Sequence, residues 1–396
     1  MDDYLNKYPV VLLHGMFGWG QQQATSKVFP YFGLLNTNVC KWFEKELGVP
    51  CVAPSLGPFT SAWNRACEAY AQLKGGTVDY GKAHAEKYGM KRYGKTYPKP
   101  MLPQWGTLDE NGDLVKVNLI GHSFGGVTSR MLAELIVNGS EEERAVTDPD
   151  DLSELFKGGH EGWVHSITAL AAPHNGMTSV EGNVGVIMRH ICRFLSDAVN
   201  LIDVTPLRTI YDINLGMYGL TPDLWDFTDI FHDKGYKEYM FEKKDTLLYD
   251  LSCEGSLVAN AKLPEHDDIY YFSYRGYRTF PFLGREIPSL KTFPLFTLLS
   301  LGMGTQNVPD VPALDWRQND SVINTKSGEA PLGAPRVDVP YHTDPADFKP
   351  GIWHVFPAAK GKDHMSFVGW LEKKEDFEGF YRKMYTDVSS VPTINK

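Results

Sequence analysis

Cysteine is scarce in this sequence, and no two cysteines have the spacing of a metal or redox site. The 396 residues contain five cysteines, which stand far apart and form no CxxC pair. An odd number at such spacing does not indicate a disulfide framework. We therefore expect free, buried thiols at Cys40, Cys51, Cys67, Cys192 and Cys253.

Positive charge is also in short supply. The formal net charge is −10 at pH 7, and no basic stripe with interleaved aromatic residues occurs along the chain. An acidic surface repels phosphate backbones, so nucleic acid is not expected as a partner.

Long apolar runs are missing as well. The most apolar stretch, FPLFTLLSLGMG from Phe293, contains Pro294 and Gly302 and is too short to cross a bilayer. We expect it to form core or pocket wall, and we expect no transmembrane segment. The opening MDDYLNKYPVVLLHG lacks the basic start and uninterrupted apolar stretch of a secretory signal. Such a signal has then been removed or never existed.

The residues that are present predict an α/β architecture. Hydrophobic residues make up 42% of the chain and aromatic residues 13%, as in a globular protein whose pockets have apolar walls. Apolar runs at YPVVLLHG, VPCVAPS, VKVNLIG and VHSITALAAPHNG predict buried strands, the first of them at the centre of the sheet. Helical spacing at 38–47, at 61–73 and after Gly121 alternates with these strands. This order predicts a doubly wound, mostly parallel sheet with ligands beyond the carboxyl ends of its strands.

The chain is expected to form a single domain, 1–396, with one large insertion. Between 177 and 250 the alternation of strands and helices is replaced by an aromatic-rich sequence that shows no clear central strand. We interpret this segment as an inserted helical cap or lid. DDIYYFSYRG and IWHVFPA then return to the sheet, the second as its last strand. The proline- and glycine-rich passage 326–351 is expected to be a surface loop.

The segment Gly121-His122-Ser123-Phe124-Gly125 is the strongest chemical signal in the sequence. It is a G-x-S-x-G motif between a buried strand and an amphipathic helix, the setting of the nucleophile elbow in the α/β-hydrolase fold. The glycines are needed because a Cβ would collide with the neighbouring strand or helix. The same G-x-S-x-G motif would also occur if the serine only capped the helix, or if the loop bound phosphate. The context favours Ser123 as a nucleophile.

A serine nucleophile needs a histidine base and a carboxylate that orients it, in the chain order serine, acid, histidine. His364 lies in a glycine-containing loop past the last predicted strand, and His342 and His354 are its nearby competitors. Asp320 lies at a turn between the serine and this histidine. Asp310 and Asp315 remain rivals for the acid.

Two backbone N–H groups are expected to stabilise the oxyanion. They belong to Phe124, after the nucleophile, and to Met16, after the first strand. The side chains of Phe17 and Trp19 are expected to bind substrate in the acyl pocket together with those of Met16 and Phe124. Ordinary core packing is the alternative for these side chains.

Together these residues and several longer strings resemble the zinc-carrying thermoalkalophilic lipases of Bacillus-type bacteria and their clostridial, polyester-cleaving relatives. The strings are VVLLHGMFGWG, NRACEAYAQLKGGTVDYGKAH, IGHSFGG, APHNG, KKDTLLYDLS, QNDSVINT and KDH. The resemblance implies the triad Ser123, Asp320 and His364 and the oxyanion donors Met16 and Phe124. It also implies that the cap at 177–250 opens at an interface. Phe124 departs from the usual glutamine, which leaves a backbone role intact.

The metal sites of this family are altered here. The resemblance places the family's zinc region at 58–106, with its two aspartate and two histidine ligands at Asn64, His84, Met90 and Asp245. Asparagine and methionine are poor zinc ligands, so zinc binding stays open but is disfavoured, with His84 and Asp245 as the remaining ligands. Ser366 and Leu371 stand at the acidic positions of the family's calcium site, so no calcium is expected there. The chemistry requires no cofactor.

The sequence thus predicts a serine carboxylic ester hydrolase, in the first place a triacylglycerol lipase that forms an acyl-enzyme and acts on lipid or other esters. A short-chain carboxylesterase or polyester hydrolase is the alternative, and a non-catalytic binding protein on the same scaffold is a remote one. The resemblance implies secretion, while the sequence itself leaves a cytoplasmic location open.

Overall fold

The computed structural model describes residues 6–203, 212, 214–220, 242–306 and 316–394. One seven-stranded sheet organises the molecule, with strand order β11-β12-β7-β6-β5-β1-β2. Every strand pair that joins them is parallel. The strands are β1 (Val10–Leu13), β2 (Cys51–Val52), β5 (Val117–His122), β6 (Val164–Leu170), β7 (Tyr270–Tyr274), β11 (Arg336–Asp338) and β12 (Trp353–Val355). The doubly wound α/β-hydrolase architecture expected from the sequence is confirmed.

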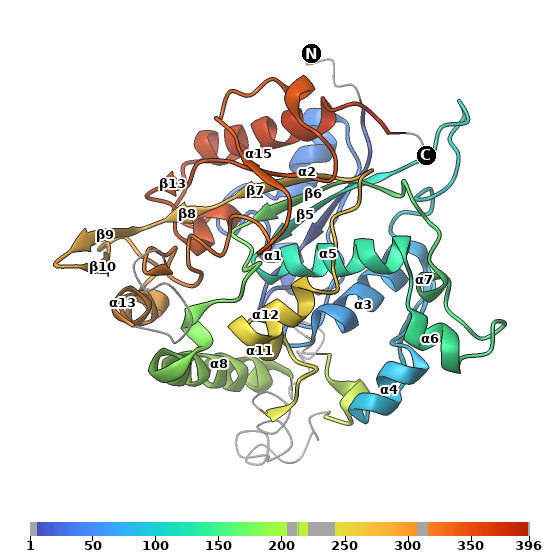
Figure 1. The fold of residues 1–396 in the computed structure, drawn as a ribbon, viewed down its shortest axis with the longest axis horizontal. Helices are drawn as coiled ribbons and strands as arrows, with labels where there is room; N and C mark the ends of the chain where they lie inside the picture. The colour runs from blue at the N-terminus through green and yellow to red at the C-terminus, as the bar shows by residue number, and fades with distance from the viewer. Residues whose placement is uncertain (1–5, 204–211, 213, 221–241, 307–315, 395–396) are drawn as a thin grey trace.

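Helices cover both faces of this sheet (Figure 1). α3 (Ala62–Lys74) and α5 (Phe124–Val137) lie on one face, and α2 (Val39–Trp42) and α15 (Lys374–Ser389) lie on the other. Alternate residues of a strand point to opposite faces, and β1 shows the result. Val11 and Leu13 join the core beneath α3 and α5, whereas Val10 and Leu12 join the core beneath α2 and α15.

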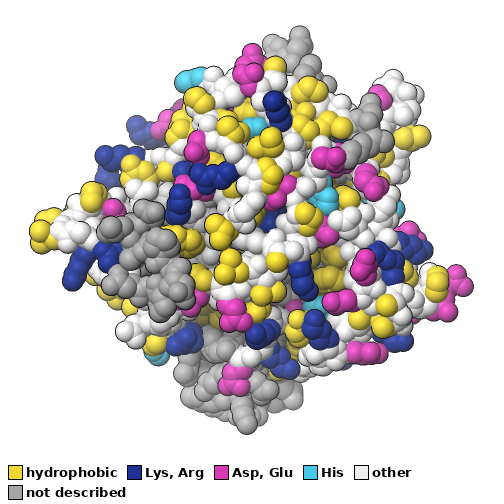
Figure 2. Space-filling model, in the orientation of Figure 1, with side chains coloured by type: hydrophobic (Ala, Val, Ile, Leu, Met, Phe, Trp, Pro, Cys, Tyr) yellow, Lys and Arg dark blue, Asp and Glu magenta, His cyan; other side chains and the backbone are white. Residues whose placement is uncertain are grey.

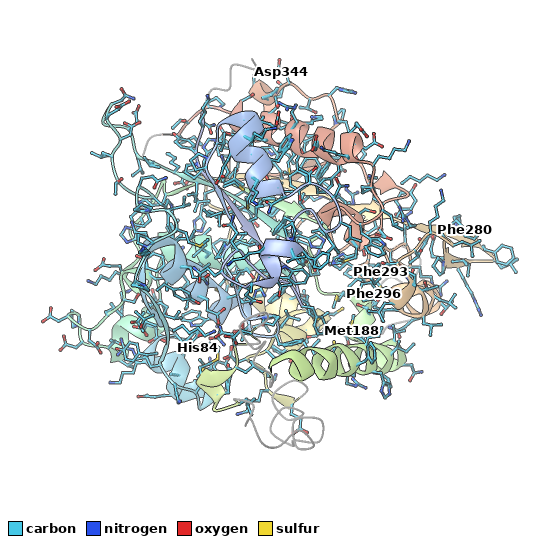
Figure 3. The ribbon with its side chains drawn as sticks, turned by 180° about the vertical axis from the view of Figure 1, so that it is seen from behind. His84, Met188, Phe280, Phe293, Phe296 and Asp344 are labelled. Carbon is cyan, nitrogen blue, oxygen red and sulfur yellow. The ribbon has the colours of Figure 1, made fainter. Side chains whose placement is uncertain are left out.

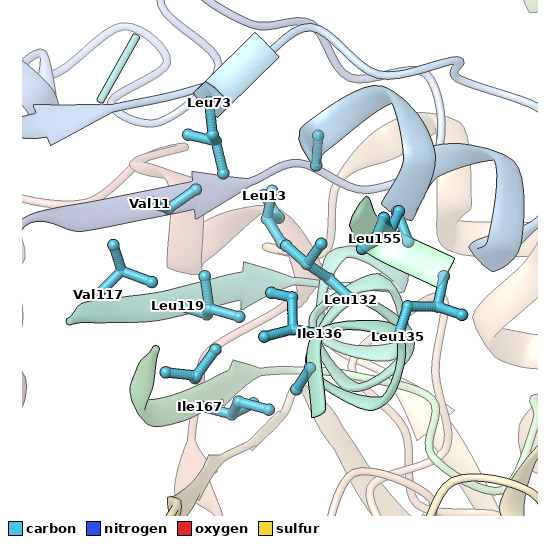
Figure 4. Packing of buried hydrophobic residues seen from close by; sticks show 14 of the residues in the cluster. Val11, Leu13, Leu73, Val117, Leu119, Leu132, Leu135, Ile136, Leu155 and Ile167 are labelled. Atoms are coloured by element: carbon cyan, nitrogen blue, oxygen red, sulfur yellow. The ribbon is translucent and has the colours of Figure 1, made fainter. Parts of the chain in front are cut away.

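The core beneath α5 shows why that helix forms where it does. Leu132 and Ile136, one helical turn apart, pack onto Leu119 and Ile167 of the neighbouring strands β5 and β6 (Figure 4). This packing fixes the amino end of α5, and with it Ser123, at the carboxyl edge of the sheet.

Further elements surround the three layers. The remaining helices are α1 (Thr25–Val28), α4 (Lys82–Tyr88), α6 (Glu141–Val146), α7 (Glu154–Lys157), α8 (Gly182–Asp203), α11 (Leu247–Asp250), α12 (Cys253–Asn260) and α13 (Thr297–Thr305). A π-helical turn, η1 (Phe43–Leu47), extends α2, and 3-10 turns are η2 (Thr178–Val180), η3 (Gly216–Tyr218), η4 (Pro294–Phe296), η5 (Pro345–Asp347) and η6 (His364–Val368). Two-stranded pairs join β3 (Gly76–Asp79) with β4 (Tyr93–Tyr97), β8 (Gly276–Tyr277) with β13 (Ala359–Lys360), and β9 (Thr279–Phe282) with β10 (Arg285–Pro288).

Two expectations about the sheet need correction. β1 lies inside the sheet but next to the edge strand β2, and β6 holds the central place. The passage 326–351 is not all loop, because Arg336–Asp338 forms the edge strand β11 beside β12. Three exposed residues are too few to show a strand periodicity in a sequence.

The cap expected at 177–250 contains η2, α8, η3 and α11 in its described part, and the described part contributes no strand to the main sheet. Residues 204–211, 213 and 221–241 of this expected cap lie outside the described residues. Across the described ranges, no helix is long and apolar enough to span a bilayer. All five cysteines are free, four of them buried and Cys253 half-buried.

Candidate active site

Ser123 stands on a strained turn between β5 and α5. Its φ of 58° and ψ of −131° lie outside the regions that ordinary residues prefer. The flanking glycines make this turn feasible. A Cβ on Gly121 would lie 2.3 Å from the carbonyl carbon of Gly125, and a Cβ on Gly125 would lie 1.9 Å from the carbonyl oxygen of Leu13. The need for glycine at both positions is therefore confirmed, and Ser123 is held at the carboxyl edge of the sheet.

His364 and Asp320 form a buried hydrogen-bonded pair. His364 Nδ1 lies 2.9 Å from Asp320 Oδ2, and the N–H of His364 donates to the carbonyl of Asp320 at 2.7 Å. The other carboxylate oxygen, Oδ1, accepts the N–H groups of Val322 at 3.0 Å and Ile323 at 2.7 Å. The carboxylate is thus fixed from both sides. With Nδ1 donating to Asp320, the Nε2 atom of His364 is left to accept a proton.

The loop of His364 lies directly against the turn of Ser123. His122 Nε2, one residue before the serine, lies 2.9 Å from the carbonyl oxygen of His364. The two imidazole rings have centroids 4.7 Å apart. The fold therefore brings the His364–Asp320 pair, which lies far along the chain, against the turn that carries Ser123.

The competing histidines occupy other environments. His342 is exposed. His354 is buried in β12, where Nε2 accepts the N–H of Lys349 at 3.1 Å and Nδ1 lies 3.1 Å from the carbonyl of Tyr271. Both ring nitrogens of His354 are therefore engaged in structural bonds. The rival acids Asp310 and Asp315 lie outside the described residues.

The expected oxyanion donors flank Ser123. A Cβ on Gly15 would lie 2.6 Å from the Cβ of Ser123, so the loop after β1 touches the nucleophile turn. Among the described residues, no acceptor is found for the N–H of Met16 or for that of Phe124. Two unused donors beside a serine side chain are the arrangement that a developing oxyanion requires.

The side chains of this loop divide into core and surface. Phe124 is fully buried beneath the guanidinium of Arg65, 5.4 Å from its ring centroid, so its side chain belongs to the core. Phe17 is half-buried with a positive φ of 56°, and its ring meets that of Phe59 edge-on at 4.6 Å. Trp19 is half-buried, and its indole N–H donates to the carbonyl of Phe29 at 2.7 Å. Phe17 and Trp19 thus retain exposed aromatic surface next to Gly15.

Arg65 is a buried residue of the site that the sequence did not single out. From α3, its guanidinium donates to the carbonyl oxygens of His14 and Gly57 (2.7 Å for Gly57) and to Thr128 Oγ1 at 3.0 Å. These bonds tie the end of β1 to α5. Burial, with the charge of Arg65, holds the pKa of His14 well below its usual value, so His14 is neutral and accepts the N–H of Leu56. An arginine inside an amphipathic helix gives no sequence signal of such a role.

Tyr31 and His122 form a second network that the sequence did not reveal. The N–H of Gly15 donates to the Tyr31 hydroxyl at 3.2 Å, and this hydroxyl lies 2.7 Å from His122 Nδ1. Burial holds the pKa of His122 well below its usual value. A neutral His122 that donates to the carbonyl of His364 through Nε2 must accept the Tyr31 proton at Nδ1. One directed chain therefore connects the oxyanion loop with the loop of His364.

Of the four positions that the Bacillus-type resemblance assigns to zinc, three lie in contact with one another. Asp245 Oδ2 accepts Asn64 Nδ2 at 3.0 Å and the Tyr218 hydroxyl, and it lies 3.1 Å from His84 Nε2. Met90 packs instead against the hydrophobic core. An amide N–H and a phenol stand where metal ligands would have to be, so these residues do not fit a four-coordinate zinc. Within the described residues, no three His, Cys, Asp or Glu side chains form a metal-binding group.

The turn that carries Ser366, one of the two positions that the resemblance assigns to calcium, is closed by protein contacts. Asp363 caps η6 by accepting the N–H groups of Met365 and Ser366, both at 3.1 Å. Its second oxygen, Oδ2, accepts a hydrogen bond from Nη1 of the Arg278 guanidinium at 3.1 Å. The aspartate is therefore saturated, and a hydroxyl and an aliphatic side chain occupy positions 366 and 371.

Comparison with known proteins identifies the family of the chain. A family model described as "Lipase-like, C-terminal domain" matches residues 6–394. Lipase 2 of Staphylococcus aureus is 37% identical over 98% of this chain and 54% of its own length, and Lipase 1 of the same species is 31% identical over 97% and 55%. This chain thus spans about half the length of the curated relatives it matches.

Solved structures match over nearly the whole chain. The lipase of Staphylococcus hyicus has a TM-score of 0.81 and 30% identity, covering 98% of this chain and 97% of its own. Lipase 1 of Pelosinus fermentans gives 0.81 and 33%, covering 98% and 100%. EstA of Clostridium botulinum gives 0.79 and 30%, covering 99% and 89%. The chain therefore belongs to the staphylococcal-type lipase family, defined by this lipase-like domain.

Proposed function

We propose that this chain is a serine carboxylic ester hydrolase, specifically a lipase that cleaves triacylglycerols, with Ser123, His364 and Asp320 as its catalytic triad. The observation that carries the proposal is the buried His364–Asp320 pair held against the strained turn of Ser123. A strained serine at the carboxyl edge of a parallel sheet is of no use to packing, but it presents the hydroxyl to a substrate.

The proposed reaction has two steps. Ser123 Oγ attacks the ester carbonyl while His364 Nε2 takes its proton, and the N–H groups of Met16 and Phe124 donate to the oxyanion. The intermediate collapses to an acyl-enzyme, and His364 gives the proton to the departing alcohol. Water then attacks the acyl carbon through the same histidine and releases the acid. Asp320 holds the imidazole tautomer and stabilises its charged form.

The substrate is proposed to reach Ser123 past Phe17 and Trp19, beneath the cap at 177–250. An apolar acyl chain gains about 0.8 kcal/mol for each CH₂ that such a wall removes from water. We infer from the Bacillus-type and clostridial resemblance that this cap opens at a lipid–water interface and that the enzyme is secreted. The same resemblance supports polyester cleavage as the alternative activity.

We further propose that the enzyme works without zinc or calcium. The support is the donor set at 64, 84, 90 and 245, where an amide donates to the carboxylate, and the hydroxyl and aliphatic side chains at 366 and 371, where the resemblance places acidic calcium ligands. Metal analysis and melting curves with and without a chelator test this proposal. Unchanged melting is expected, and about one zinc per chain whose removal lowers the melting temperature would contradict it. As a positive control, Asn64→Asp/Met90→His restores the family's ligand types and should acquire zinc-dependent melting.

The activity is tested by hydrolysis of p-nitrophenyl esters from acetate to palmitate, with the parent and Ser123→Ala measured side by side. We expect a long-chain preference in the parent and loss of activity in the variant. A short-chain maximum would favour the esterase or polyester hydrolase, and an inactive parent would favour a binding protein. Retained cleavage by Ser123→Ala would contradict the assigned nucleophile.

A further inference from the structure

The β9–β10 hairpin projects from the body of the molecule and carries an apolar tip (Figure 1). Phe280 is 49% exposed, Phe282 57% and Leu283 85%. Figure 2 shows hydrophobic side chains at this projecting end, and Figure 3 shows Phe280 on it, with Phe293 and Phe296 nearer the body on the same side. Large apolar side chains gathered at a protruding tip mark an interaction site more often than chance exposure does.

The backbone of the tip is unfavourable for the residue that occupies it. Leu283 and Gly284 form the two-residue turn, with φ of 47° and 71°. Positive φ at both central residues defines the type I′ turn, in which asparagine precedes glycine by preference. Leucine here is both strained and exposed. It contributes little to the folded state, so its presence points to a function outside the fold.

The apolar residues share one face of the hairpin. Phe280 pairs with Ile287 and Phe282 with Arg285, and paired residues lie on the same face. The opposite face packs on α13, because Glu286, which points away from Arg285 and Ile287, has its Cβ 3.2 Å from the position that a Cβ on Gly304 would take. The phenylalanine face is therefore the one turned away from the helix.

The charge at the hairpin is opposite to that of the chain. Between 279 and 298 the charged residues are Arg285 and Lys291, both exposed, and the half-buried Glu286. Arg317 adds a further positive charge, because it donates to the carbonyl of Gly284. A positive tip on a chain of net charge −10 favours contact with an anionic surface.

The base of the hairpin is bonded to the candidate active site. The N–H of Arg278 donates to the carbonyl of Asn319 at 3.1 Å, directly before Asp320. The Arg278 guanidinium reaches Asp363, directly before His364, at 3.1 Å. A surface that receives the hairpin is thereby held in a fixed orientation to these loops.

We propose that the β9–β10 hairpin is an anchor that inserts Leu283, Phe282 and Phe280 into the surface of a lipid phase carrying carboxylates, while Arg285 binds those anionic groups. The inference rests on the proposed function, because the ester phase is the substrate and its hydrolysis releases fatty carboxylates into that surface. Insertion buries the leucine that the fold leaves in water.

The test measures binding to vesicles of ether-linked phosphatidylcholine, which offer no ester bond, with and without oleate. Leu283→Asn suits the type I′ turn, so it should fold with an equal or higher melting temperature. Loss of one buried leucine should weaken vesicle binding about tenfold or more. Arg285→Gln should weaken binding only when oleate is present. Rates on soluble p-nitrophenyl butyrate should match the parent for both.

Leu108→Asn is the matched control, because Leu108 is 68% exposed in the loop that leads into the opposite, amino end of β5. Equal binding of Leu283→Asn and the parent, or an equal loss in the control, would overturn the anchor. A change in molecular mass by sedimentation without a change in vesicle binding would overturn it too, in favour of self-association. An inactive parent that still binds through the hairpin would contradict the proposed function and leave the anchor standing.

Discussion

At the scale of single residues, the candidate site depends on side chains that have only one workable hydrogen-bond arrangement. One carboxylate oxygen of Asp320 accepts hydrogen bonds from two backbone N–H groups, and the other is hydrogen-bonded to His364. Nothing about the carboxylate is left free to rotate. The imidazole is therefore held in the tautomer that leaves Nε2 able to accept the proton of Ser123.

Replacing this acid tests that arrangement. In Asp320→Asn, the amide oxygen keeps the turn bonds while the NH₂ group faces Nδ1 and favours the wrong tautomer. We expect kcat on p-nitrophenyl butyrate to fall about 10³- to 10⁴-fold with little loss of stability. The rival acid supplies the control, because Asp315→Asn should retain the parental rate. A normal rate in Asp320→Asn, or an equal loss in Asp315→Asn, would contradict the assignment.

Tyr31 is expected to act as a positioning residue. Tyr31→Phe removes the acceptor of the Gly15 N–H and the donor to His122, so the oxyanion loop loses its tie to the loop of His364. We expect kcat to fall about three- to tenfold at an almost unchanged KM. Tyr271→Phe is matched, because Tyr271 is also buried and accepts a backbone N–H, that of His266, at 2.9 Å. If the control lowers kcat equally, Tyr31 has only a structural role.

At the scale of elements, α3 is tied to the active-site edge through Arg65. The guanidinium satisfies two carbonyl oxygens and one hydroxyl that water does not reach. We expect Arg65→Met to lower the free energy of unfolding by about 2 to 4 kcal/mol, because two carbonyls lose their donors in the interior. Arg65→Lys should not restore it, since an ammonium lacks the planar fork.

Denaturant unfolding measures this effect against Arg144→Met. Arg144, like Arg65, bonds three oxygen atoms, here the carbonyls of Asn138, Phe156 and Lys157, but it is exposed. Water can replace its bonds, so the control should lose much less stability. Comparable losses in the two variants would mean that burial of Arg65 is not the cause.

The secondary-structure elements differ in how well the sequence alone predicts them. Val10–Leu13 is apolar throughout, and Val117–His122, with the sequence VNLIGH, is buried throughout and leads into the glycines of the elbow, so both strands and the elbow could be predicted. The β9–β10 hairpin could not, because its Leu-Gly turn lacks the Asn-Gly signal. β11 is too short to have a pattern. Tyr31 and Arg65 acquire their roles from partners distant in sequence, which no local pattern encodes.

At the scale of the whole molecule, buried ionisable groups determine how stability varies with pH. Burial holds the pKa values of His14, His122 and His174 well below the usual value and lowers that of His165 to about 3. Below pH 6.5 the unfolded chain binds protons at these residues that the folded chain does not. Stability is therefore lost as the pH falls below about 6.5.

Glu68 and Asp250 act in the opposite direction. Burial raises the pKa of each carboxyl to about 7, so the folded chain holds protons that the unfolded chain has released. Their contribution lowers stability as the pH rises from about 4 to about 7. Burial also lowers the pKa of His354 and raises the pKa values of Asp363 and Asp387, so five histidines act against four carboxyls, and the net slope in the shared window should be positive.

His165→Gln tests this balance. The variant should reduce the slope of unfolding free energy against pH by about 1.4 kcal/mol per pH unit between pH 4.5 and 6, the effect of one proton. Denaturant unfolding at a series of pH values measures it. His342→Gln, at an exposed position, should leave the slope unchanged. An unchanged slope in His165→Gln would show that this histidine is protonated in the folded chain.

Ser123 is the proposed nucleophile, and covalent labelling identifies the nucleophile of a serine hydrolase without relying on loss of activity alone. A fluorophosphonate is added to the parent and to Ser123→Ala, and the modified peptide is identified by mass spectrometry while ester hydrolysis is followed. We expect one adduct, on the peptide that contains Ser123, with activity lost in proportion to labelling and no adduct in the variant. An adduct on another residue, or labelling that persists in Ser123→Ala, would contradict it.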